Sequence, residues 1–289
     1  AGVECTPVFA GNSPLVDEAA AAAGLPLLRF GRRIAPELIE MNKAGAWNGH
    51  VPVTAINSAI CLCAAILYGY KYIVFSNERS ADQATLVSPA GKAINHQYSK
   101  GSAFEAAFRQ LIAGQVGRGI DYFSVVRPFS ELGIVEKFSG LEQYHGIYSS
   151  CNRNFHIEGS RIEGRWCGDC PKCRFAALSL ALYMPPARVS QIIGRDMLDD
   201  PGQADGFRAL CALGRDKPFE CVGESGESRA AMRELASHPD WSGHAVVKAL
   251  QSELEGVQIP EMETLLEPSS RHFIPRHLAK AMGLFAEAT

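Results

Sequence analysis

Short apolar runs alternate with helical segments at the start of the chain. Val3 to Ala10 is an apolar run that predicts a buried strand, and Leu25 to Phe30 is a second run of this kind. Between them, the alanine-rich segment from Leu15 to Ala23 favours a helix that begins at Pro14 and stops at Gly24. A strand, a helix and a strand at this spacing predict a βαβ unit with parallel strands.

The same alternation continues through the first half of the chain. A nearly all-apolar segment from Val53 to Tyr68 predicts a helix packed on most sides, and Lys71 to Phe75 predicts a strand after it. A further helix is expected from Gly101 to Ala113, and a further strand from Asp121 to Val126. The pattern therefore predicts an α/β fold with a Rossmann-like parallel sheet.

The pattern changes after the proline pair at 185–186. Leucines, alanines and charges then recur at helical spacing, interrupted by a polar stretch from Asp216 to Glu224. We expect three regions: an α/β nucleotide-binding-like domain over residues 1–140, a cysteine-rich metal region over 141–185, and a mainly helical region over 186–289.

Composition excludes some classes of protein. The chain has 289 residues and a net charge of −3, and it has no basic run interleaved with aromatic residues, which argues against a nucleic-acid partner. No apolar run is long enough for a transmembrane helix, and no secretory signal is evident. Nine cysteines, five of them scattered, are typical of the reducing cytoplasm, where we expect the protein. Residue 1 is alanine and the first residues read as a strand, so we expect an N-terminal truncation.

Four cysteines predict a metal site. Cys151, Cys167, Cys170 and Cys173 have a spacing that can direct four thiolates to one tetrahedral centre, which zinc prefers. Four protein ligands leave no open position for a catalytic water, so the site is expected to be structural. The alternatives are an iron–sulfur cluster, four free thiols or two disulfides.

Polar residues follow two of the predicted apolar elements in positions where α/β sheets bind ligands. Asn48 and His50 precede the helix that starts at Val53, where free backbone N–H groups favour an anion. Asn77, Glu78 and Arg79 follow the strand that ends at Phe75. We take these five as candidate nucleotide- and substrate-binding residues, although a plain turn and a solvated surface loop remain alternatives.

Six sequence blocks carry a resemblance to a known family. A parallel α/β sheet followed by a four-cysteine region is similar to the PP-loop ATP-pyrophosphatase group, including 7-cyano-7-deazaguanine synthase. More specifically, the chain resembles the UDP-N-acetylmuramoyl-L-alanyl-L-glutamate epimerase family over nearly its whole length. The blocks are WNGHVPVTAINSAI (47–60), FSNERSA (75–81), INHQYSKG (94–101), SSCNRNFHI (149–157), RWCGDCPKCRF (165–175) and KPFECVGE (217–224).

The resemblance implies an ATP- and magnesium-dependent isomerase with structural zinc. Its small-molecule substrate would be UDP-MurNAc-L-Ala-L-Glu, whose terminal L-glutamate becomes D-glutamate, in peptidoglycan precursor synthesis. The phosphate-binding loop of the group, Ser/Gly-Gly-Gly-x-Asp-Ser, does not occur in this chain. The resemblance places that loop, with the first strand, upstream of residue 1. A different adenylated substrate, such as a deazapurine, and a zinc-stabilised module without activity are the alternatives.

Candidate proton-transfer residues lie in and near the blocks. Cys221 and Glu220 belong to the KPFECVGE block, where Lys217 would stabilise a Cys221 thiolate. His145 and His156 are further candidates, although a lone histidine is more often a satisfied polar residue. A small buried residue is the alternative interpretation of Cys221.

Overall fold

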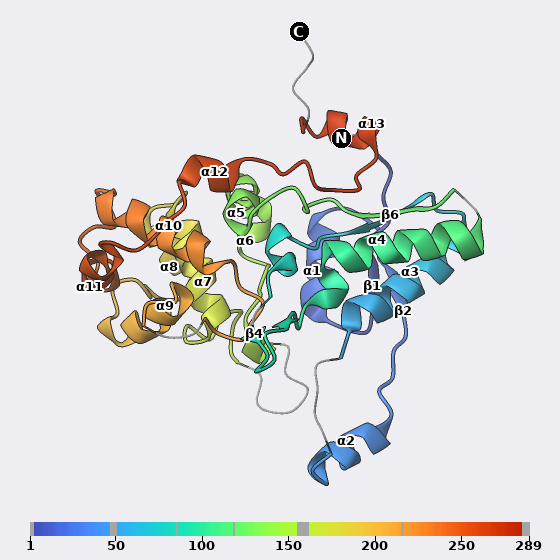
Figure 1. Cartoon of the computed structure of the whole chain (residues 1–289), viewed down its shortest axis with the longest axis horizontal. Coiled ribbons are helices and arrows are strands. Elements are labelled where there is room, and N and C mark those ends of the chain that lie inside the picture. The colour runs from blue at the N-terminus through green and yellow to red at the C-terminus, as the bar shows by residue number, and fades with distance from the viewer. Residues whose placement is uncertain are drawn as a thin grey trace. The chain divides into compact units, whose positions relative to one another are not determined.

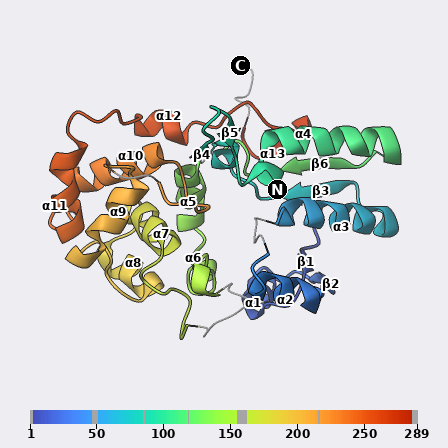
Figure 2. The same ribbon diagram turned by 60° about the horizontal axis from the view of Figure 1, so that its bottom comes forward.

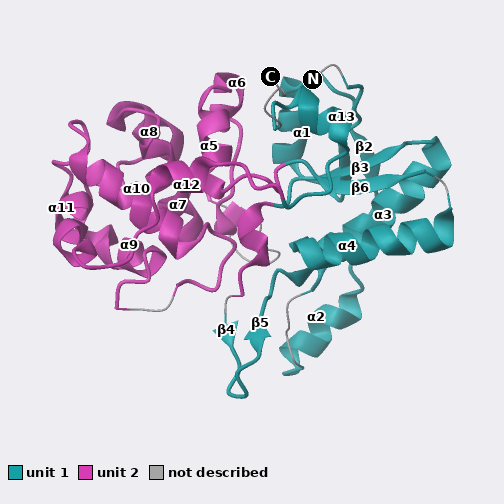
Figure 3. Cartoon of the chain, turned by 45° about the horizontal axis from the view of Figure 1, so that its top comes forward, with its two compact units in different colours: residues 1–77, 86–125, 271–289 teal, residues 78–85, 126–270 magenta. Residues whose placement is uncertain are grey.

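A computed structural model describes residues 3–46, 51–84, 86–117, 119–154, 162–214 and 217–284. The chain forms two compact units that are interleaved in sequence (Figure 3). Unit 1 contains residues 1–77, 86–125 and 271–289, and unit 2 contains residues 78–85 and 126–270. This division differs from the three consecutive regions expected from the sequence, because the last residues of the chain return to unit 1.

Unit 1 contains two pairs of parallel strands. Strand β1 (Val8–Ala10) pairs with β2 (Leu28–Phe30), and helix α1 (Pro14–Ala22) connects them. Strand β3 (Tyr72–Phe75) pairs in parallel with β6 (Asp121–Ser124). The predicted βαβ unit is confirmed, including Pro14 in the first turn of the helix.

The strands are shorter than the sequence predicted. The runs that begin at Val3 and Leu25 become strands only after Pro7 and Pro26, because proline donates no backbone hydrogen bond to a ladder. The described strands form three two-stranded sheets and no larger one. A mixed α/β fold with parallel pairing is therefore confirmed, whereas a continuous Rossmann-like sheet is not seen among the described residues.

Helices cover the second strand pair. Helix α3 (Val53–Tyr68) has the predicted bounds and ends at Gly69, whose φ of 76° suits glycine. Figure 2 shows α3 beside β3 and α4 (Ser102–Leu111) beside β6. The remaining elements of unit 1 are α2 (Pro36–Lys43), the antiparallel strands β4 (Leu86–Val87) and β5 (Ala93–Ile94), the 3₁₀ turn Tyr98–Lys100, the π turn Ile112–Val116 and α13 (Arg276–Ala281).

A small core holds β3 and β6 to these helices. Ala65, Ile73, Ile112 and Tyr122 are buried together, and the Tyr122 hydroxyl lies 2.8 Å from the hydroxyl of Ser58 on α3. Beside this core lies an apolar cavity of about 790 Å³, lined by both β1 and β3 but by neither β2 nor β6. The cavity therefore lies along the edges of β1 and β3 that have no strand partner among the described residues.

Unit 2 is mainly helical and is built around α7 (Pro171–Ala181), where seven residues are buried. Figure 1 shows neighbouring helices gathered around it, and α5, α8, α9 and α10 all contact it. The expected helical C-terminal part is confirmed. Its elements, with the helices preceding α7, are the 3₁₀ turn Arg79–Asp82, α5 (Glu131–Ser139), α6 (Glu142–His145), the 3₁₀ turn Asn152–Asn154, α8 (Pro186–Ile193), the 3₁₀ turn Pro201–Gln203, α9 (Ala204–Leu210), α10 (Ser225–Ser237), α11 (Ala245–Gln251), the 3₁₀ turn Ser252–Leu254 and α12 (Met262–Leu266).

In the part of the chain that the structure describes, no helix combines the length and hydrophobicity that crossing a bilayer requires.

Candidate functional site

The four predicted cysteine ligands converge in unit 2. The sulfur atoms of Cys151, Cys167, Cys170 and Cys173 all lie within 4.8 Å of one another. Cys173 Sγ lies 3.4 Å from Cys170 Sγ and 3.7 Å from Cys167 Sγ. These separations fit the edges of a tetrahedron around zinc, about 3.8 Å for Zn–S bonds of about 2.3 Å. None of the nine cysteines, all within the described residues, forms a disulfide, so the two-disulfide alternative was wrong.

The thiols depend on one another for their protonation. The hydrogen bond between Cys170 and Cys173 lowers the pKa of the Cys170 thiol and raises the pKa of the Cys173 thiol. Burial is the main cause of the raised pKa of Cys151. Four thiolates this close would repel one another strongly without a cation between them, which a divalent metal supplies.

Local structure fixes each ligand. Cys170 is the N-cap of α7 and Cys173 lies in its first turn, which Pro171 starts. Gly168 has a φ of +65°, and a Cβ atom there would lie 2.5 Å from Cδ of Arg195. The backbone N–H of Cys167 donates to Cys151 Sγ at 3.3 Å. The fold thus places all four sulfurs on rigid or tightly turned backbone.

The loop that carries Glu220 and Cys221 contacts the two segments that carry the cysteine cluster. Asn152, next to Cys151 in the chain, donates from Nδ2 to Glu220 Oε1 at 2.8 Å. Gly223 lies so close to α7 that a Cβ atom would be 2.3 Å from the Phe175 ring. The structure therefore brings two predicted proton-transfer candidates into the neighbourhood of the four cysteines.

Lys217 lies in a setting that the sequence indicated only in part. Burial lowers its pKa, while the carboxylates of Glu224, Glu227 and Glu131 and the Cys221 sulfur oppose that shift. Perturbed lysines among acidic groups are typical of functional sites. The sequence pointed to Lys217 as a partner of Cys221, but it gave no sign of the distant Glu131.

Glu227 is the buried carboxylate that the sequence reasoning missed. It is 2% exposed, and burial raises its pKa. Its carboxylate accepts hydrogen bonds from the backbone N–H groups of Leu132 (3.2 Å) and Glu224 (2.8 Å). The pair Glu224 and Glu227 forms a capping box at the start of α10, which the glutamate at the third helical position could have signalled.

His145 has a different environment from the Cys221 loop. It is 2% exposed, and its ring nitrogens lie 3.1 Å from the Phe138 carbonyl (Nε2) and 3.1 Å from Nη2 of Arg188 (Nδ1). Because a carbonyl only accepts and a guanidinium only donates, Nε2 carries the proton and Nδ1 accepts. Both nitrogens are thus engaged within the protein.

The candidate residues after β3 divide between the two units. In unit 1, Asn77 is buried and its carbonyl accepts from the hydroxyl of Ser124, at the end of β6, at 2.6 Å. Glu105 of α4 is 1% exposed and accepts from the Ser124 N–H at 3.0 Å. This strand end therefore carries buried polar groups, as the sequence predicted for Asn77.

In unit 2, Glu78 and Arg79 make backbone contacts. The Glu78 carbonyl accepts from Nη1 of Arg127 at 2.6 Å, and Arg79 donates to the carbonyls of Leu265 (2.9 Å) and Glu267 (3.2 Å). Arg79 thus caps the C-terminal end of α12. Asn48, His50 and His156 lie outside the described residues.

Comparison with known families identifies the chain's relatives. Residues 1–125 match the MurL N-terminal domain and residues 147–264 match the MurL C-terminal domain. The chain belongs to the MurL family. The MurL C-terminal match contains the four cysteines and the Cys221 loop, whereas His145 falls between the two matched regions.

The individual relatives share the same name. A protein of Xanthomonas oryzae pv. oryzae is 48% identical over 278 residues, which is 95% of this chain and 61% of the relative. A protein of Salinispora tropica is 39% identical over 99% of this chain and 62% of the relative. Both are named UDP-N-acetyl-alpha-D-muramoyl-L-alanyl-L-glutamate epimerase. The chain thus spans about three fifths of the length of the curated relatives it matches. No solved structure matches it significantly.

Proposed function

We propose that this MurL chain supports the epimerisation of the terminal glutamate of UDP-MurNAc-L-Ala-L-Glu from the L to the D configuration. The observation that carries the proposal is the 48% identity, over 95% of the chain, to the Xanthomonas oryzae protein that is named as an epimerase of this substrate. The convergence of the Cys221 loop, Lys217 and the four-cysteine cluster in the MurL C-terminal region adds support.

The chemistry needs activation of the substrate. The Cα–H beside a free carboxylate is a very weak acid, because its carbanion would add charge to an existing anion. The glutamate nitrogen is tied up in an amide, so a pyridoxal imine cannot form. Adenylation of the α-carboxylate by ATP, with magnesium, would remove that charge and release pyrophosphate. The neutral carbonyl could then accept the electrons of the broken C–H bond. Reprotonation of Cα from the opposite face would invert the centre. Hydrolysis of the mixed anhydride would then release AMP and UDP-MurNAc-L-Ala carrying a terminal D-glutamate.

The described residues do not supply the phosphate-binding loop of the PP-loop group. The motif Ser/Gly-Gly-Gly-x-Asp-Ser is absent from the sequence, so no ATP-binding step is assigned to these residues. We nevertheless propose that the sheet is of the PP-loop type. The apolar cavity of about 790 Å³ along the unpartnered edges of β1 and β3 supports this, because it offers room for a further parallel strand.

We assign proton transfer at Cα to Cys221, with Lys217 as its partner. A thiol can act as base or acid in an inversion, and burial lowers the pKa of Lys217, which makes its ammonium group a better proton donor than an exposed lysine. Glu220 and His145 remain weaker candidates, because Glu220 accepts a hydrogen bond from Asn152 and both ring nitrogens of His145 are engaged.

We assign a structural zinc ion to the four cysteines. The cysteine-only donor set and the sulfur separations fit zinc. When bound, zinc would neutralise the thiolates and join the segment around Cys151 to the start of α7. It would leave no coordination position for substrate.

Solvent exchange at Cα tests the proposed reaction. The test protein is the Xanthomonas oryzae relative with its matched region replaced by this chain (the chimera). In D₂O, with ATP and magnesium, the chimera should introduce one deuterium at the glutamate Cα, because the proton returns from solvent. Cys221→Ser should slow this exchange by at least about 100-fold, whereas Cys63→Ser, an exposed cysteine on α3, should leave it unchanged.

Two results would count against these assignments. Exchange that proceeds without ATP would contradict activation by adenylation. Unchanged exchange in Cys221→Ser would remove Cys221 from the proton-transfer step and leave the family-level proposal intact.

A further inference from the structure

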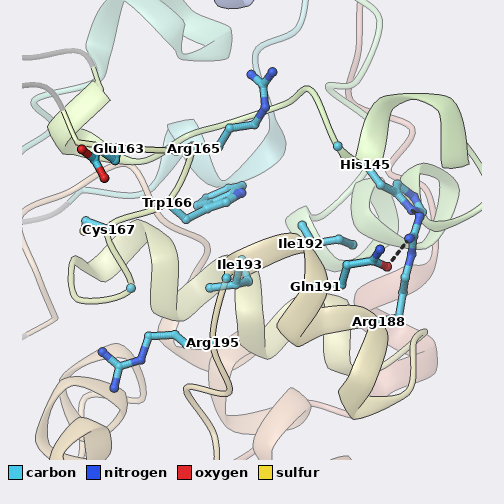
Figure 4. A pocket seen from close by; sticks show the side chains of 14 residues that line it. His145, Glu163, Arg165, Trp166, Cys167, Arg188, Gln191, Ile192, Ile193 and Arg195 are labelled. Atoms are coloured by element: carbon cyan, nitrogen blue, oxygen red, sulfur yellow. Dashed lines mark hydrogen bonds between the residues drawn. The ribbon is translucent and has the colours of Figure 1, made fainter.

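A second cavity lies in unit 2 beside the cysteine cluster. Its volume is about 620 Å³, and it is lined by residues 145–146, 163–168, 188 and 191–195 (Figure 4). None of its lining residues belongs to the loop that carries Cys221. Cavities of about 300–1,000 Å³ are the usual size for small-molecule sites.

Trp166 presents an unused hydrogen-bond donor in this cavity. The residue is 8% exposed, and its indole N–H has no hydrogen-bond partner among the described residues. Figure 4 shows the nitrogen-bearing edge of the ring turned toward the side of the cavity that His145 and Arg188 line. A buried N–H without a partner is unfavourable, so this position suits a ligand that brings an acceptor.

Arg188 is held across the cavity by fixed neighbours. It donates to Gln191 Oε1 at 2.6 Å and to Nδ1 of His145 at 3.1 Å. These contacts use two of the five N–H donors of a guanidinium group. His145 is itself fixed by its bond to the Phe138 carbonyl, so Arg188 is preorganised.

The charge of the cavity selects an anion. Arg165 and Arg195 also line it, and among the described residues Glu163 is the one carboxylate in the lining, which Figure 4 places at the Cys167 end. Arg165 donates to the Ile147 carbonyl at 2.9 Å, and Arg195 pairs with Asp200 outside the lining. Figure 4 shows the side chains of Arg165 and Arg195 directed away from Arg188, so Arg188 and the unpaired indole N–H are the donors best placed for a ligand with acceptor oxygens.

We propose that this cavity binds the diphosphate of a nucleoside diphosphate group, with Trp166 and Arg188 as its main contacts. The cavity is much larger than a phosphate ion, and Ile192 supplies apolar surface for the attached nucleoside. The choice of a uridine diphosphate rests on the proposed function, whose substrate carries one. An inorganic diphosphate shares the same chemistry and is separated by the test below.

Calorimetric titration of the whole zinc-loaded chain with UDP, and separately with pyrophosphate, tests this site. UDP should bind, and pyrophosphate should bind more weakly. Trp166→Phe removes one N–H and should weaken UDP binding about fivefold, and Arg188→Gln should weaken it about 10- to 100-fold.

Matched controls are available in unit 2. Trp241→Phe removes the other buried indole N–H that has no partner among the described residues, and Trp241 does not line the cavity. Arg233→Gln removes a guanidinium that pairs with Glu261. Both should leave UDP affinity within about twofold, and zinc content and melting temperature should report that all four variants are folded.

The outcomes separate this site from the proposed function. The site would be overturned if Trp166→Phe and Arg188→Gln bound UDP as tightly as the unsubstituted chain. Absence of UDP binding at millimolar concentration would also overturn it. Pyrophosphate that binds as tightly as UDP would overturn the nucleoside assignment. If the chimera still epimerises its substrate, and Trp166→Phe and Arg188→Gln each leave its KM unchanged, the proposed function stands and the UDP site is refuted. If the chimera is inactive but binds UDP in a way that depends on Trp166 and Arg188, the UDP site stands and the proposed function is refuted.

Discussion

Gly168 is the residue on which the geometry of the cysteine cluster depends most directly. It lies between Cys167 and Cys170 of the cluster, adopts a φ of +65°, and leaves no room for a Cβ beside Arg195. Left-handed backbone favours glycine because other residues clash with their own Cβ there. Glycine at this position thus permits both the tight turn between Cys167 and Cys170 and the close packing of the Arg195 side chain.

Gly168→Ala should therefore destabilise the metal-bound fold. The left-handed backbone would cost alanine about 1–2 kcal/mol, and the displaced Arg195 side chain would add to this. We expect a lower melting temperature and weaker zinc retention against a competing chelator. Gly140→Ala is the control, because Gly140 has a φ of −83° and ordinary space around it. Equal zinc retention in the two variants would contradict this account of Gly168.

At the residue scale the sequence predicted the convergence of the four cysteines but not the long-range side-chain contacts. The spacing of four cysteines was sufficient to predict their convergence, because short spacings in one chain restrict where the sulfurs can point. The setting of Arg79 was not predictable, since its partners at 265 and 267 lie far away in sequence. The pairing of His145 with Arg188 is hidden for the same reason.

At the element scale, the helices and the strands β3 and β6 were predicted to within about two residues, whereas β1 and β2 are much shorter than the runs that predicted them. Helix α3 has the expected bounds because an apolar run of 16 residues ending at a glycine has few alternatives. The strands are 3 or 4 residues long in the parallel pairs. Their apolar runs are longer because they include prolines and flanking residues that are not part of the ladder.

The unpartnered edges of β1 and β3 give a prediction at this scale. Pro7 and Gly11 bond to β2, and Lys71 and Phe75 bond to β6. Because alternate residues of a parallel strand point to opposite edges, the N–H groups of Val8, Ala10, Tyr72 and Val74 face the cavity side. In the chimera, the rest of the relative should supply a further strand between β1 and β3. That strand should slow hydrogen exchange at these four amides by at least about tenfold relative to this chain alone.

Hydrogen exchange measured at single-residue resolution would check this, with the amides of Phe9 and Ile73, on the paired edges, as internal controls. Rapid exchange at Val8 and Val74 in an active chimera would contradict a sheet of the PP-loop type.

At the scale of the whole molecule, the chain crosses between its two units several times. Residues 271–289 belong to unit 1, where Ile274 and Ala279 are buried with Phe123 of β6. A composition change at Pro185–Pro186 is visible in sequence, but a distant segment that returns to a sheet is not. This is why consecutive regions were expected where the structure has interleaved ones.

The central claim is that this chain supports glutamate epimerisation, and chiral analysis of the product tests it most directly. The chimera and the parent relative would each be incubated with UDP-MurNAc-L-Ala-L-Glu, ATP and magnesium, and the glutamate would be released by hydrolysis. The account predicts D-glutamate together with an equivalent amount of AMP from both proteins. Only L-glutamate from a folded, metal-loaded chimera, beside an active parent, would contradict it.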